Sequence, residues 1–178
     1  MKLDFGASMD GIAQIAFTVA DLRGAAEQWT KSTRIGPWFV RGPFTPAEAR
    51  YRGKPTYPSL SLARAFSGAT MIELIEQHDD TPSVYLDGIA RNGYGLHHCA
   101  SMTDSFDSKI LQACARGGTV EFEDSLPSGS RVAYVLDDPI EPFGYHEYIE
   151  YTPAQESVYT KYFHEGLTWD GADPWREG

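Results

Sequence analysis

Residues 14–21 read QIAFTVAD, and residues 98–104, which begin 84 positions further along the chain, read HCASMTD. Each stretch begins with a side chain that can bind a metal ion, continues as a short strand, and ends at an aspartate suited to start a helix. A strand-like segment with a glutamate closes each copy, IELI around Glu73 and YIEY around Glu150. The repeat therefore predicts a duplicated unit in which Gln14, Glu73, His98 and Glu150 take matching places.

Both copies show the same order of elements: a strand, a helix and three further strands, written βαβββ. The helices are expected to begin at Asp21 in the first copy and at Asp104 in the second. We predict an α+β fold in a single domain, residues 1–178. It comprises a first module at 10–80, a linker, a second module at 94–153, and a C-terminal helix and tail at 154–178.

The composition limits the possible functions. The formal net charge is −10, which argues against nucleic acid as a partner because nucleic-acid-binding proteins usually carry a basic stripe. No apolar run reaches the roughly 18 residues that a membrane helix needs. The two cysteines, Cys99 and Cys114, form no CxxC pair. We expect a cytoplasmic protein with reduced thiols and no membrane partner.

The four matching side chains predict a metal site. A carboxylate in the middle of an apolar strand is costly to bury unless it is ion-paired or bound to a cation. Two carboxylates in equivalent places, with one imidazole and one amide, suit a divalent Zn, Ni, Co, Mn or Fe ion. The alternative for each glutamate is an ion pair with an arginine, such as Arg64 or Arg131. His97 faces away from His98 and is expected to be packed or hydrogen-bonded.

The paired βαβββ modules and their glutamate-bearing closing strands resemble the vicinal oxygen chelate superfamily from Gly11 to Pro153. This superfamily includes glyoxalase I, methylmalonyl-CoA epimerase, extradiol dioxygenases and bleomycin-binding proteins. The resemblance implies a cleft-shaped half-barrel, the glyoxalase-like fold. The four predicted ligands resemble the metal set of glyoxalase I, whereas the segment GLHH at 95–98 is more similar to the epimerases. In those epimerases the first ligand is usually histidine, where this chain has Gln14.

The resemblance implies a metal-dependent isomerase, epimerase or lyase that abstracts a proton next to a carbonyl through a metal-stabilised enediolate. Glu150 and Glu73 would then be the catalytic carboxylates. Thr18 and Tyr94 stand where glyoxalase I has arginines that bind glutathione, so a lactoylglutathione lyase is not expected. An extradiol dioxygenase fits less well, because Gln14 replaces one of its two histidines. The alternative from another class is a non-catalytic binding protein for a drug or metabolite.

A small, largely apolar substrate is expected, because aromatic residues crowd the segments of the predicted cleft. The substrate-binding candidates are Trp38, Tyr134, Tyr148 and Arg64. The basic loop at 41–54 could hold a carboxylate or a phosphate, or it could be a solvated loop. We also expect a homodimer, because edge strands leave hydrogen-bonding groups that need cover.

Overall fold

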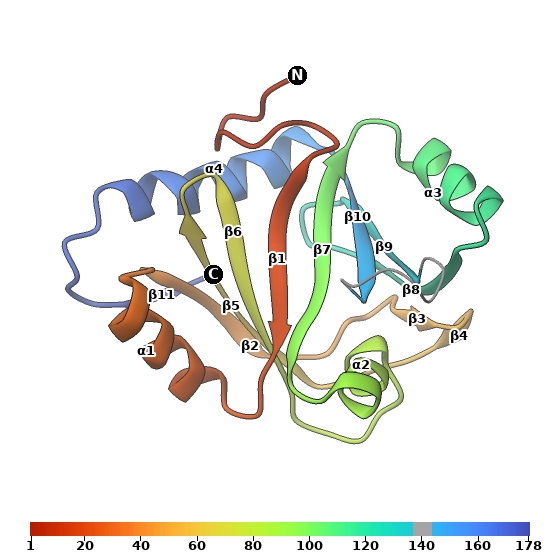
Figure 1. Ribbon diagram of the computed structural model, residues 1–178, viewed down its shortest axis with the longest axis horizontal. Coiled ribbons are helices and arrows are strands. Elements are labelled where there is room, and N and C mark those ends of the chain that lie inside the picture. The colour runs from red at the N-terminus through yellow and green to blue at the C-terminus, as the bar shows by residue number, and fades with distance from the viewer. Residues whose placement is uncertain (137–143) are drawn as a thin grey trace.

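Two βαβββ units lie side by side in one mixed sheet, in the computed structural model that describes residues 1–136 and 144–178 (Figure 1). The first unit consists of β1 (Ile12–Thr18), α1 (Leu22–Thr33), β2 (Trp38–Phe44), β5 (Leu60–Ser67) and β6 (Thr70–Gln77). The second consists of β7 (Gly95–Thr103), α3 (Phe106–Ala115), β8 (Thr119–Ser125), β9 (Arg131–Leu136) and β10 (Tyr145–Glu150).

Strand pairing repeats between the two units. β1 runs parallel to β6, and β7 runs parallel to β10. The other pairs within each unit are antiparallel, and the units meet where β1 pairs antiparallel with β7. The resulting order, β2-β5-β6-β1-β7-β10-β9-β8, is symmetric about the β1–β7 pair. The predicted α+β glyoxalase-like fold is confirmed.

The two helix starts differ although an aspartate stands at the matching place in each copy. Asp21 caps α1, and its side chain accepts a hydrogen bond from the Gly24 amide. The cap of α3 is Ser105 rather than the predicted Asp104, and no side chain caps the backbone there. Asp104 instead accepts a hydrogen bond from the Ser105 hydroxyl, so it supports the turn without capping the helix.

The helices α1 and α3 cover the outer face of the sheet. In the first unit Leu22 and Ala26 of α1 pack with Ile72 and Leu74 of β6. In the second unit Phe106 of α3 packs in a separate cluster with Val135 and Tyr148. Because side chains alternate along a strand, Met71 and Ile75 of β6 point the other way. They belong to the main core on the inner face.

Two features of the connecting segments were not predicted. The linker contains α2 (Val84–Asn92), which Ser83 caps through its hydroxyl. The basic loop contains a hairpin of β3 (Arg50–Tyr51) and β4 (Lys54–Pro55), which extends the sheet beyond β8. This hairpin belongs to the first half of the chain but pairs with the second half. It therefore ties the two units together at the far edge of the sheet.

The C-terminal segment covers the inner face of the first unit. The predicted helix is α4 (Pro153–Leu167), and the tail ends in β11 (Trp175–Glu177), which pairs parallel to β2. Tyr162 of α4 stacks on Phe39 of β2 with ring centres 3.9 Å apart. Tyr159 packs edge-on against Phe5 from the N-terminal segment. None of the helices in residues 1–136 and 144–178 has the length and apolar character needed to cross a membrane.

Candidate metal and proton-transfer site

Four polar side chains meet on the inner face, where the two units join. They come from the four central strands: Gln14 from β1, Glu73 from β6, His98 from β7 and Glu147 from β10. All four are at least 95% buried. Nε2 of Gln14 lies 2.9 Å from Oε2 of Glu73, 3.2 Å from Nε2 of His98 and 3.4 Å from Oε2 of Glu147. The structure thus brings together three of the predicted residues and adds a fourth, Glu147.

Glu147, and not Glu150, is the counterpart of Glu73. In the first unit Ala16, two residues after Gln14, pairs with Glu73. In the second unit Ala100, two residues after His98, pairs with Glu147. The strand register therefore makes the two buried carboxylates equivalent about the centre of the sheet.

The predicted place of Glu150 in the cluster is wrong. Its carboxylate accepts hydrogen bonds of 2.8 and 2.7 Å from Nε and Nη2 of Arg131. Arg131 also binds Asp107 of α3, so Glu150 lies on the outer, helix-covered side of β10. Glu150 and Glu147 are three residues apart on one strand and so face opposite sides.

Glu73 also has an arginine partner. Nε of Arg64 donates to Oε1 of Glu73 at 2.6 Å, which leaves Oε2 directed at Gln14. The alternative left open by the sequence, an arginine partner for each predicted glutamate, is therefore what the structure shows for Glu73 and for Glu150. For Glu73 the two roles are compatible, because one oxygen binds Arg64 and the other faces the cluster.

The hydrogen bonds of the histidine pair define the tautomer of His98. Nε2 of His97 lies 3.1 Å from the Val84 carbonyl oxygen, which can only accept, so His97 donates from Nε2. Nδ1 of His97 then accepts from Nδ1 of His98 at 2.8 Å. Burial lowers the pKa of His98 to about 4 and that of His97 to about 3, so both rings are neutral at pH 7. Nε2 of His98 therefore presents a lone pair to the cluster.

The cluster holds more acceptors than donors. The amide of Gln14 supplies two N–H groups to three acceptor atoms, on Glu73, His98 and Glu147. Oε2 of Glu147 is also only 3.2 Å from the His98 lone pair. Burial raises the pKa of Glu147 to about 7, although its hydrogen bond with Tyr134 acts in the opposite direction. A proton on Glu147, or a cation among the acceptors, relieves the repulsion between these lone pairs.

The donor set fits a divalent metal ion once the Gln14 amide turns. Within the described parts of the chain, no three His, Cys, Asp or Glu side chains already form a metal site. In the same residues, Oε1 of Gln14 is a buried oxygen without a hydrogen-bond partner. Rotation of the amide exchanges this oxygen with the nitrogen and directs it at the cluster. Three oxygens and one imidazole nitrogen would then face one point, a set that first-row divalent metals accept.

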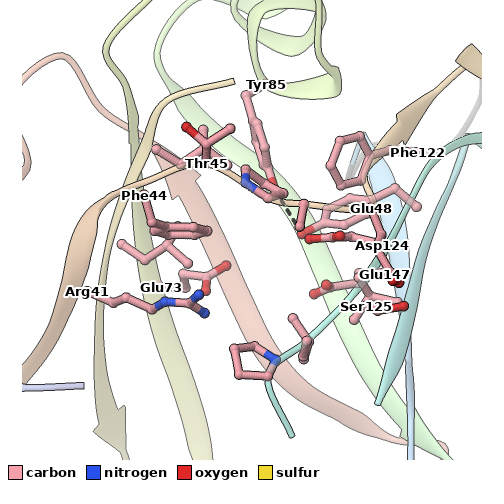
Figure 2. A pocket seen from close by; sticks show the side chains of 18 of the residues that line it. Arg41, Phe44, Thr45, Glu48, Glu73, Tyr85, Phe122, Asp124, Ser125 and Glu147 are labelled. Carbon is pink, nitrogen blue, oxygen red and sulfur yellow. Dashed lines mark hydrogen bonds between the residues drawn. The ribbon is translucent and has the colours of Figure 1, made fainter. Parts of the chain in front are cut away.

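A cavity of about 380 Å³ opens beside the cluster, between the two units (Figure 2). The cluster residues Gln14, Glu73 and Glu147 line it, as do two predicted substrate-binding residues, Arg64 and Tyr134. Two further tyrosines that were not predicted also line the cavity: Tyr85 of α2, whose hydroxyl lies 3.4 Å from that of Tyr134, and Tyr159 of α4. Both come from elements outside the duplicated modules, so the repeat carried no signal for them.

Trp38 and Tyr148, the other two substrate-binding candidates, lie on the outer face. Trp38 is fully buried in the cluster under α1, and its Nε1 donates to Thr30. Tyr148 packs under α3. Neither lines the cavity. Aromatic residues were assigned to the cleft by their segment alone, whereas strand alternation decides which face each one takes.

The basic loop is divided between the surface and the cavity. Arg52 binds Glu121 and Asp87, and Arg50 donates to the Gly53 carbonyl oxygen. Arg41 instead lines the cavity. Thus one of the loop's arginines faces the site.

The fold and the site together define a protein of paired βαβββ modules with a cluster of possible metal ligands on its pseudo-twofold axis. The model of the Glyoxalase/Bleomycin resistance protein/Dioxygenase superfamily matches residues 13–134. The chain belongs to this superfamily, so its predicted resemblance to the vicinal oxygen chelate proteins is confirmed. The sequence has no match among curated proteins.

Solved structures share the fold at low sequence identity. Methylmalonyl-CoA epimerase from Mycobacterium tuberculosis is similar with a TM-score of 0.54 and 16% identity, over 85% of this chain and 95% of that one. A hypothetical protein from Bacillus halodurans has a TM-score of 0.54 and 19% identity, over 79% of this chain and 94% of that one. A variant of the Streptomyces coelicolor methylmalonyl-CoA epimerase, in complex with 2-nitronate-propionyl-CoA, has a TM-score of 0.51 and 19% identity. The match covers 82% of this chain and 97% of that one.

Proposed function

We propose that this protein is a metal-dependent enzyme that removes a proton from a carbon next to a carbonyl group, as an isomerase, epimerase or lyase. The observation that carries the proposal is the meeting of Gln14, Glu73, His98 and Glu147 at one buried point beside a cavity. These four residues would hold a divalent Zn, Ni, Co, Mn or Fe ion. When bound, the ion would supply Lewis-acid stabilisation to two adjacent oxygens of the substrate.

Glu147 is the best candidate for the general base. Its carboxylate lines the cavity, and no arginine of the described chain forms an ion pair with it. Glu73 is held by Arg64 through one oxygen, which fixes the position of this carboxylate. Glu147 would therefore take the proton from the substrate carbon and return it, while Glu73 keeps the site in place. Tyr134 would orient Glu147 through their hydrogen bond.

The experiment measures exchange of a substrate proton with deuterated water by NMR. The panel contains 2-hydroxyketones, 2-oxoaldehyde adducts and acyl thioesters, each with the metal-loaded protein. Glu147→Gln should slow exchange by about 10²–10⁴-fold, since an amide cannot take the proton. Glu150→Gln, on the same strand but on the outer face, is the matched control and should keep the wild-type rate. An equal loss of exchange rate in both variants would contradict the assignment of Glu147 as the base.

A non-catalytic binding protein is the second candidate. The ion pair between Arg64 and Glu73 favours it, because Arg64 neutralises one carboxylate of the cluster without a metal. Metal analysis of protein purified without a chelator separates the two candidates. About one divalent ion per chain supports the enzyme. Tight binding of an apolar ligand by metal-free protein, with no proton exchange on any panel member, supports the binding protein. Assembly as a homodimer stays a prediction, which light scattering at micromolar concentration can measure.

A further inference from the structure

The guanidinium of Arg41 faces the cavity without a carboxylate partner. Arg41 is half-buried on β2, and its guanidinium carbon lies 4.1 Å from the ring centre of Phe44. In the described chain no aspartate or glutamate lies within ion-pair distance of it. A partly buried cation without a partner is unfavourable, so this one is available to an anionic group of a ligand.

Arg64 adds positive charge to the same wall of the cavity. Arg64 pairs with Phe39, two residues before Arg41, so the two arginines share the inner face of neighbouring strands. Burial and, after it, the nearby Arg64 guanidinium lower the pKa of Arg41. Glu73 engages Arg64 through a single guanidinium nitrogen, Nε. The two arginines therefore leave a positive excess on this wall.

The opposite wall of the cavity is acidic. Asp124 and Glu48 line it, and Figure 2 shows both across the cavity from Arg41. Burial raises the pKa of the Asp124 carboxyl, which also feels Glu48, while Ser125 and Arg41 act in the opposite direction. A negatively charged ligand group is thus favoured beside Arg41 and disfavoured beside Asp124. This difference between the walls gives a bound anion one orientation.

We propose that the substrate carries a carboxylate remote from its reacting carbonyl group, and that Arg41 binds this carboxylate. The proposal rests on the proposed function, because it assigns the carbonyl end to the cluster of Gln14, Glu73, His98 and Glu147. The planar guanidinium matches a carboxylate with two parallel hydrogen bonds. A phosphate dianion fits less well, because Arg64 is already engaged by Glu73 and Asp124 stands opposite. The cavity volume of about 380 Å³ suits a small molecule with an apolar body.

The test uses pairs of hydroxamate probes, whose two adjacent oxygens suit a metal ion. Calorimetry on the zinc-loaded full chain compares 3- and 4-carboxybenzohydroxamate with the neutral carbamoyl compounds of the same shape. At least one carboxylate should bind about 10-fold more tightly than its carbamoyl partner, as expected for a charge-assisted hydrogen bond. Arg41→Gln should abolish this preference and leave the carbamoyl affinity within about twofold. Arg50→Gln, which alters a loop arginine directed at Gly53, is the matched control and should change neither.

The possible failures of the two proposals are distinguishable. If both members of each pair bind equally well to the wild type, or if Arg41→Gln weakens both equally, the role of Arg41 is overturned and the metal site stands. If no hydroxamate binds, the metal role fails. The role of Arg41 is then decided by saturation-transfer NMR on metal-free protein. The probes are benzoate and the neutral benzamide. A benzoate signal that exceeds the benzamide signal and disappears in Arg41→Gln supports the role of Arg41, and equal signals overturn that role.

Discussion

Nε2 of His98 lies 3.2 Å from Oε2 of Glu147, and both atoms carry lone pairs when Glu147 is ionised. The orientation of the imidazole depends on His97, which accepts from His98 and donates to the Val84 carbonyl oxygen. A chain of hydrogen bonds thus runs from the Val84 carbonyl oxygen of α2 through His97 to His98, and it orients the candidate metal ligand. His97, which was expected to be packed or hydrogen-bonded, therefore also holds the candidate ligand His98 in place.

Replacing His97 should weaken metal binding without removing a ligand. His97→Phe keeps a ring in the same space but removes the acceptor that orients His98. Zinc affinity should fall by about 10–100-fold, the usual effect of losing a group that orients a metal-bound histidine. Competition with a fluorescent zinc chelator measures the change. His164→Phe, on the exposed side of α4, is the control. If His97→Phe leaves the zinc affinity unchanged, His97 does not orient His98 for metal binding.

The ion pair of Glu150 should stabilise the fold at neutral pH and contribute nothing to the site. Its hydrogen bonds with Arg131 lower the pKa of Glu150 below the ordinary value of 4.5. The unfolded state therefore binds more protons at low pH, so this contribution is present above about pH 4.5 and is lost as the pH falls through the folded-state pKa. Glu150→Gln should cost about 1 kcal/mol at pH 7 and less at pH 3. Urea unfolding at both pH values checks this, and a loss of equal size at both would contradict it.

The sequence predicted the two modules because the pattern of β1 recurs in β7. It also placed Gln14 and His98 correctly, since each begins its repeat. The sequence contained enough information to predict the ion pair between Arg64 and Glu73. The two-residue turn at 68–69, between Ser67 of β5 and Thr70 of β6, brings these two positions face to face in the hairpin.

The choice between Glu147 and Glu150 was harder, because both lie on β10 and face opposite sides. The prediction of Glu150 rested on matching YIEY at 148–151 with IELI at 72–75, which selects the glutamate on the outer side of the strand. The better signal was the match between MIELI at 71–75 and YHEYI at 145–149, in which the central glutamate has an apolar residue two positions away on either side. The face itself depends on pairing with β7, which is not local in sequence.

Docking of α4 on the inner face should depend on Tyr162. This side chain is 5% exposed and stacks on Phe39. Tyr162→Ala should destabilise the protein by about 3 kcal/mol, through lost burial and a cavity under the helix. Lys161→Ala, exposed on the same turn, is the control. Urea unfolding measures both, and a loss below 1 kcal/mol for Tyr162→Ala would show that the helix docks without this contact.

Changing Gln14 to glutamate should make the fold depend on metal. Gln14→Glu has nearly the same shape, but it removes the two N–H donors that join Glu73, His98 and Glu147 and adds a third carboxylate. The metal-free variant should be less stable than the wild type by about 3 kcal/mol, since a buried charge lacks a partner. A divalent ion binds the folded state and restores stability by mass action. Thermal unfolding with zinc and with a chelator should therefore show a larger metal-induced shift for Gln14→Glu than for the wild type. Equal shifts would mean that a metal ion does not bind among these four side chains.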